Sequence, residues 1–225
     1  MSILAGMMIA LGCIVYINIG SVAGALLFSV GLLSVVLYKF ELFTGKAGLL
    51  ARGQITLSRL GKIWLGNLLG VVIMIAIAIH LPNQEAIATA CRGIMEARAQ
   101  TGFLGSFLLA IPCGMLMYMA VSSPDNPMRL FYVSMCVMAF ICGGFYHCVA
   151  DMFYTLAGAM TWQQYVNIFF VTAGNFVGCN IIPLAQKYHD PKGHHENSVA
   201  TPSTHLHQDA IYNLDKPELH QGAPR

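Results

Sequence analysis

Long apolar segments separated by short polar connections occupy most of the chain. A membrane-spanning helix needs ~20 mostly apolar residues. Six segments come close to this requirement or exceed it, at residues 3–18, 21–40, 60–81, 103–122, 128–155 and 162–186. The pattern predicts an all-α membrane protein with six transmembrane helices. The second and fifth segments run into polar residues, so we expect each of them to consist of two half-helices joined by an unwound turn.

Both interruptions place ionisable side chains in sequence that is otherwise apolar. The first runs from Lys39 to Lys46. The second runs from Gly143 to Asp151 and contains His147. Glycine weakens a helix, and an Asp at mid-span costs ~2.5–3.5 kcal/mol. Such a stretch is tolerated where it faces a cavity instead of lipid. A kinked helix whose histidine bonds a neighbouring carbonyl is the simpler alternative.

A short motif recurs in the two halves of the chain. The sequence Gly-Asn-Leu-Leu-Gly at 66–70 matches Gly-Asn-Phe-Val-Gly at 174–178. A Gly-x-x-x-Gly spacing alone commonly marks close helix packing. Each copy here follows an interrupted helix, which favours duplication of a three-helix unit. Because three is an odd number of spans, we expect two inverted three-helix repeats with a solute path at their interface.

The composition excludes several classes of function. Of the 225 residues, 56% are apolar and 10% are charged, which is too apolar for a soluble domain. The net charge of +2 gives no reason to expect nucleic acid as a partner. The 7 cysteines lie scattered without a metal-type spacing, so they predict neither a metal centre nor a disulfide framework. No residue set resembles a hydrolytic or redox site, and we expect neither enzymatic activity nor a cofactor.

Basic residues are distributed unequally between the two sides of the expected bundle. One side has only Arg92 and Arg98, whereas the other collects Lys46, Arg52, Arg59, Lys62, Arg129, Lys187 and Lys192. The positive-inside rule then predicts a multi-pass protein of the cell membrane with both termini in the cytoplasm.

Two segments lie outside the expected spans. Residues 82–102 carry apolar positions on one helical face, which suits a short helix at the membrane interface or packed on the bundle. The chain turns polar near Lys187, so we expect a channel domain over 1–187 and a disordered cytoplasmic tail over 188–225. Histidines in that tail would suit metal binding, but a solvated tail is the simpler interpretation.

The interrupted segments resemble those of the formate/nitrite transporter family, pentameric channels for small monovalent anions with an aquaporin-like fold. Glu-Leu-Phe-Thr-Gly at 41–45 is similar to the family's loop in the second span. Gly-Phe-Tyr-His-Cys-Val-Ala at 144–150 is similar to its fifth-span motif with the central histidine. The resemblance implies a homopentamer with one pore per protomer. It also implies a substrate pathway lined by His147, Thr44 and the constriction residues Phe28, Leu32, Leu42, Phe43 and Phe140.

Five positions depart from the family pattern. Tyr146 stands where the family usually has Glu, and Asp151 stands where it usually has Asn. Gly114 replaces an expected Asn, Arg98 replaces a Lys, and Lys39 has no counterpart. All of these except Gly114 are candidate modulators of the pathway. An unpaired carboxylate would oppose an anion, so we expect Asp151 to form an ion pair with Lys39.

Residue chemistry suggests how a solute would cross. A bare anion cannot pass a ring of Phe and Leu without losing its hydration, whereas a neutral weak acid can. Free imidazole titrates near pH ~6.5, so His147 would couple anion and proton movement while the Thr44 hydroxyl orients it. The expected partners are small monovalent anions such as formate, nitrite or hydrosulfide, together with protons and the lipid bilayer.

Three other interpretations stay open at this level. An aquaporin-like conduit for small neutral solutes would use the same fold without anion preference. A membrane scaffold or sensor would use the tail to bind a partner. The candidate constriction residues would also suit ordinary core packing.

Overall fold

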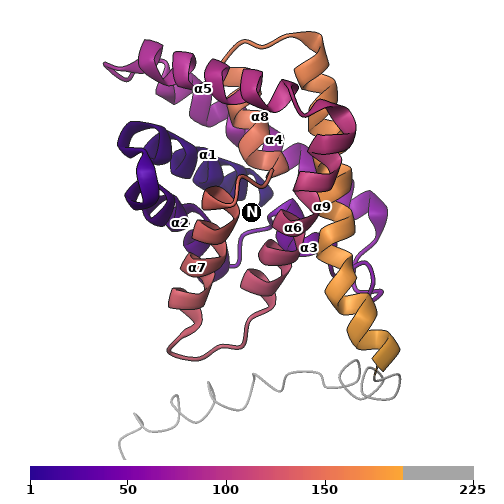
Figure 1. Ribbon diagram of the computed structural model, residues 1–225. Helices are drawn as coiled ribbons and strands as arrows, with labels where there is room; N and C mark the ends of the chain where they lie inside the picture. The colour runs from indigo at the N-terminus through magenta and orange to yellow at the C-terminus, as the bar shows by residue number, and fades with distance from the viewer. Residues whose placement is uncertain (190–225) are drawn as a thin grey trace, which may run out of the picture. The chain divides into compact units, whose positions relative to one another are not determined.

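The computed structural model describes residues 1–189, which form a chain of helices without strands in that range (Figure 1). The helices are α1 (Ser2–Ile19), α2 (Ser21–Leu37), α3 (Phe43–Ala47), α4 (Leu57–Ala78), α5 (Gln84–Ala99), α6 (Gly102–Ser122), α7 (Arg129–Cys142), α8 (Cys148–Ala157) and α9 (Trp162–His189). The tail expected over 188–225 lies outside the described residues, apart from the two residues that end α9.

Several of these helices have the length and composition of membrane spans. α1, α4, α6 and α9 are long and apolar enough to cross a bilayer, whereas α2, α7 and α8 are apolar but shorter. Large apolar side chains lie exposed on the helix surfaces, among them Leu65 of α4, Leu104 of α6 and Phe169 of α9. Apolar exposure on this scale fits contact with lipid or with another subunit. The expected all-helical chain with several apolar helices is confirmed.

A polar interruption lies between two helices in each half of the chain. In the second apolar segment, 21–40, α2 ends at Leu37, and α3 begins beyond the segment at Phe43. In the fifth, α7 ends at Cys142 and α8 begins at Cys148. The intervening residues run from exposed positions at Lys39 and Gly144 to buried positions at Leu42 and His147.

Gly144 ends α7 by adopting a left-handed backbone conformation with a φ of 71°. The amide of Phe145 turns back to donate to the carbonyl of Phe140 at 3.0 Å, and the amide of Gly144 donates to Ile141 at 3.1 Å. This pair of bonds is the Schellman arrangement, which satisfies carbonyls that the end of a helix would leave free.

Lys39 ends α2 with a similar geometry. Its φ is 56°, and the amide of the next residue, Phe40, donates to the carbonyl of Val35 at 2.9 Å. A left-handed conformation costs a non-glycine residue about 1–2 kcal/mol. The Lys39 side chain is exposed, so this residue interrupts the helix through its backbone.

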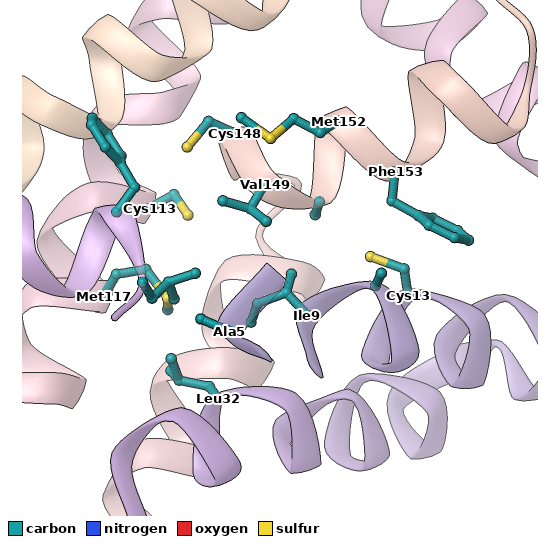
Figure 2. Close-up of a cluster of buried hydrophobic side chains, with 14 of the residues drawn as sticks. Ala5, Ile9, Cys13, Leu32, Cys113, Met117, Cys148, Val149, Met152 and Phe153 are labelled. Atoms are coloured by element: carbon teal, nitrogen blue, oxygen red, sulfur yellow. The ribbon is translucent and has the colours of Figure 1, made fainter. Parts of the chain in front are cut away.

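The apolar core lies between α1, α2, α6 and α8. Figure 2 shows Ile9, Leu32, Met117 and Phe153 converging there, one from each of these helices. α8 is buried from Cys148 to Thr155 and packs against α1, α4 and α5 (Figure 1). A helix buried on every side provides fixed positions for the side chains at its start.

α5 is the helix expected within 82–102. Ile87, Cys91 and Met95 form its buried face, and the helix packs against α8 and α1. Packing on the bundle therefore accounts for its apolar face.

The glycines of the repeated motif allow helices to approach closely. A Cβ atom on Gly70 of α4 would collide with the Ile3 carbonyl oxygen of α1. A Cβ atom on Gly178 of α9 would collide in the same way with the Ile111 carbonyl oxygen of α6. Gly114 of α6 also lies against backbone atoms of α9, which excludes a side chain there without a shift of the helices.

Asn67, in the first copy of the motif, bonds three backbone groups. Its Oδ1 accepts from the amide of Phe43, the first residue of α3, at 2.9 Å. Its Nδ2 donates to the carbonyls of Ser2 at 2.8 Å and Glu41 at 2.9 Å. The side chain thus ties α4 to the start of α1 and to the segment that enters α3.

Asn175, in the second copy, makes the same three kinds of bond. Its Oδ1 accepts from the amide of Cys148, the first residue of α8, at 2.8 Å. Its Nδ2 donates to the carbonyls of Ala110 and Tyr146, each at 2.8 Å. Ala110 precedes Asn175 by 65 residues, the separation that also joins Ser2 and Asn67. The motif therefore occupies matching structural positions in both halves.

Replacing Gly70 with Ala should lower the thermal unfolding midpoint of the detergent-solubilised protein. The added methyl forces α1 and α4 apart, and such overpacking typically costs ~1–3 kcal/mol. Gly61→Ala is the matched control, because Gly61 lies in the same helix with nothing near its Cβ position. Equal midpoints for the two variants would contradict the close approach.

Replacing Asn175 with Leu should destabilise the protein more strongly than Asn167→Leu in the same helix. The first change leaves three backbone groups without their partner, and each buried group so orphaned costs ~1–3 kcal/mol. Asn167 is also buried, but its Oδ1 has no hydrogen-bond partner among residues 1–189. Thermal unfolding of both variants provides the comparison, and a similar loss in each would show that the Asn175 bonds contribute little.

Candidate functional site

Thr44 and His147 meet in the interior although 103 residues separate them. The Thr44 Oγ1 atom lies 3.1 Å from His147 Nε2. Their exposed fractions are 0% and 2%. Thr44 is the second residue of α3, and His147 immediately precedes α8. The contact therefore joins the starts of the two helices that the asparagines hold in place.

The second ring nitrogen of His147 is also engaged. His147 is the N-cap of α8, and its Nδ1 accepts from the amide of Ala150 at 3.3 Å. A nitrogen that accepts a hydrogen bond carries no proton, so the neutral imidazole holds its proton on Nε2. Nε2–H then donates to Thr44 Oγ1, which leaves the threonine O–H free to donate to another group.

Two of the expected constriction residues stack toward His147. The rings of Phe28 of α2 and Phe140 of α7 meet edge to face, with centroids 5.7 Å apart. The Phe140 and His147 rings have centroids 5.7 Å apart and are tilted by 31°. Both phenylalanines are buried, and the Phe140 ring lies beside the imidazole.

The other three expected constriction residues are buried in the same core. Leu42 is the N-cap of α3, and Phe43 is its first residue. Leu32 comes from α2 and lies in the core cluster (Figure 2). Their location is compatible with a constriction and equally with core packing, so their part in a pathway stays a prediction.

A cavity of about 320 Å³ opens beside His147. It is bounded by α1, α5, α7 and α8 together with the segment between α7 and α8. Its lining includes His147, Phe140, Arg98, Tyr146, Tyr154 and Tyr16. It therefore brings an imidazole, a guanidinium and three phenols to one space.

Asp151 forms an ion pair with Arg98 of α5, which corrects the expected pairing with Lys39. The Asp151 side chain is fully buried, and that of Arg98 is 15% exposed. Lys39 cannot take this place because its backbone turns at the end of α2 and its side chain is exposed. The buried face of α5 instead carries Arg98 onto α8.

Two aromatic rings flank the Arg98 guanidinium. Its Cζ atom lies 4.4 Å from the ring centroid of Tyr146 and 5.3 Å from that of Tyr154. Cation–π contacts of this kind stabilise a positive charge where water is scarce. Three candidate modulators, Arg98, Asp151 and Tyr146, are thus parts of one cluster.

Sequence reasoning missed three contributors to the site. Tyr154 and Tyr16 line the cavity, and no motif in the sequence distinguishes them from other tyrosines. Asn175 was noticed only as part of a glycine motif, although it positions the start of α8. Its repetition as Asn67 is the signal that would have identified it. No group of three metal-type ligands occurs in the described range.

Comparison with known proteins assigns this architecture to a family. The family model described as Formate/nitrite transporter matches residues 1–188. The uncharacterized transporter YrhG of Bacillus subtilis is 30% identical over 186 residues, covering 72% of this chain and 68% of the relative. The formate channel FocA of Haemophilus influenzae is 30% identical over 207 residues, covering 73% of this chain and 72% of the relative.

Two solved structures share the fold. A pentameric formate channel with formate bound superposes with a TM-score of 0.66 at 22% identity, covering 84% of this chain and 93% of the other. An ion channel described as belonging to the FNT family gives a TM-score of 0.67 at 24% identity, covering 84% and 87%. The chain is a multi-pass membrane protein and not an enzyme, and it belongs to the formate/nitrite transporter family.

Proposed function

We propose that the protein is a passive, proton-coupled channel for small monovalent anions such as formate, nitrite or hydrosulfide. The family assignment and the likeness to a relative named a formate channel support this class of solute. The observation that carries the proposal is the buried Thr44–His147 pair at the meeting point of α3 and α8.

The apolar rings beside this pair oppose the passage of an ion. Phe140 lies beside His147 and Phe28 lies beside Phe140, and an ion passing these apolar rings would lose its hydration. A weak acid in its neutral form crosses such a layer at far lower cost. The anion therefore takes up a proton before it passes the rings and releases it on the far side.

Thr44 and His147 are suited to deliver that proton. The Thr44 hydroxyl accepts from His147 Nε2–H and is free to donate its own hydrogen to an anion. An anion nearby favours the imidazolium form, so solute and proton arrive together. Protonation at Nδ1 would break the hydrogen bond from the Ala150 amide. The proton step is therefore coupled to the start of α8.

The two halves of the chain act as inverted three-helix repeats. The first half comprises α1, the α2–α3 pair and α4, and the second comprises α6, the α7–α8 pair and α9. The matched bonds of Asn67 and Asn175 support this correspondence. The solute path runs where α3 and α8 meet, with the start of α8 adding positive potential.

Orientation follows from the charged connections. The segment from α3 to α4 carries Lys46, Arg52 and Arg59, and it belongs on the cytoplasmic side together with both termini. α5 and the cavity beside His147 then lie toward the outside.

Replacing His147 with Phe should abolish pH-dependent formate uptake into proteoliposomes while the protein still assembles. His147→Asn keeps a polar side chain but removes titration, so it should also lose the pH dependence. Stopped-flow measurement of formate uptake across pH 5–8 tests this dependence. In the native protein, uptake should rise as pH falls.

His80→Asn is the matched control, because His80 is exposed beyond the end of α4. It should leave uptake unchanged. Uptake that keeps its pH dependence without His147 would exclude the protonation step. Rapid passage of neutral solutes with no anion-dependent uptake in the native protein would favour the aquaporin-like conduit.

The assembly should be a homopentamer with one pore in each protomer. The solved formate channel that shares the fold is pentameric, and the exposed apolar helix faces provide surfaces for subunit contact. Native mass spectrometry of the detergent-solubilised protein should give five subunits. A stable tetramer would contradict this arrangement.

A further inference from the structure

The ion pair between Arg98 and Asp151 is isolated from other polar partners. Both carboxylate oxygens of Asp151 and the Nη1 atom of Arg98 are buried, and none has a hydrogen-bond partner within residues 1–189. The ion pair joins Arg98 Nη1 to Asp151 Oδ1. Each group therefore depends on the other to offset the loss of water.

Arg98 has the features of a carboxylate-binding group. A guanidinium is planar, always charged and matched in geometry to a carboxylate. Tyr146 and Tyr154 lie beside its guanidinium, and it lines the cavity that also contains His147. That cavity, at about 320 Å³, is large enough for a small anion.

The side chain that pairs with Arg98 carries the same functional group as formate, one of the proposed solutes. Asp151 presents a carboxylate, the functional group of formate, from the first turn of α8. A free carboxylate in the cavity can reach the guanidinium only if Asp151 gives up some of its contact. Tethering keeps the local concentration of the Asp151 carboxylate high, so it competes strongly.

We propose that Arg98 is a subsite for small carboxylates in the vestibule and that Asp151 is its tethered occupant, which competes with incoming anions. This inference rests on the proposed anion function. The native chain therefore binds anions weakly at this point, because the apparent affinity falls with the fraction of Arg98 that is free.

Replacing Asp151 with Asn should lower the formate concentration at half-saturation of uptake by about tenfold or more, because it frees Arg98 with little change in shape. Asp125→Asn is the matched control, since Asp125 is 95% exposed and pairs with Arg129 elsewhere at 3.5 Å. It should leave half-saturation unchanged. Adding Arg98→Gln to the Asp151→Asn variant should cancel the gain, which separates the subsite from a general change of charge.

Asp151→Ala provides a second test that does not depend on transport. The change removes a carboxylate beside Arg98, so added formate should raise the thermal unfolding midpoint of this variant more than that of the native protein. Asp125→Ala should respond as the native protein does. Recovery of a folded Asp151→Ala pentamer only in the presence of formate would support the subsite equally.

The outcomes distinguish this inference from the proposed function. If the formate concentration at half-saturation is unchanged in Asp151→Asn while the native protein keeps pH-dependent uptake, the proposed competition by Asp151 is overturned. The proposed anion function would then stand. Loss of the function itself would show as absent anion uptake in the native protein, and the formate effect on Asp151→Ala would still decide the subsite. Failure of Asp151→Asn and Asp151→Ala to fold, with or without formate, would overturn the proposed subsite. The Asp151 side chain would then be needed for stability beyond its pairing with Arg98.

Discussion

Backbone groups at helix ends inside an apolar interior require fixed partners, and this constraint organises the structure. Water is scarce there, so an unpaired amide or carbonyl is costly. Asn67 and Asn175 each bond two such groups at the start of α3 or α8, and a third backbone group in α1 or α6. Close helix packing at the neighbouring glycines brings the asparagines within reach. The position of the Thr44–His147 pair depends on these bonds.

His147 both caps a helix and contacts the buried threonine. Its Nδ1 caps α8, and its Nε2 contacts Thr44. A capping histidine has a defined orientation and tautomer, which a freely rotating side chain would lack. Any change in its protonation is therefore coupled to the start of a helix that is buried on every side.

Three of the five positions that depart from the family pattern are in contact with one another. Tyr146, Asp151 and Arg98 form one contact cluster at the cavity beside His147. The negative charge lies in the first turn of α8, where the positive end of the helix dipole favours a carboxylate. Arg98 balances that charge, and Tyr146 stacks on Arg98. The cluster joins two opposite charges beside this cavity.

The apolar helices, the two interruptions and the repeated Gly-Asn motif can all be predicted from the amino-acid sequence, since each depends on local composition and spacing. Motifs similar to those of the family also predicted a shared site for Thr44 and His147, and the fold places these side chains 3.1 Å apart. The sequence did not determine the partner of Asp151. Lys39 was the expected cation, yet its left-handed backbone at the end of α2 leaves its side chain exposed. Arg98 reaches Asp151 because the buried face of α5 packs on α8, and contacts between helices far apart in the chain follow from the packing of the whole bundle, not from local sequence.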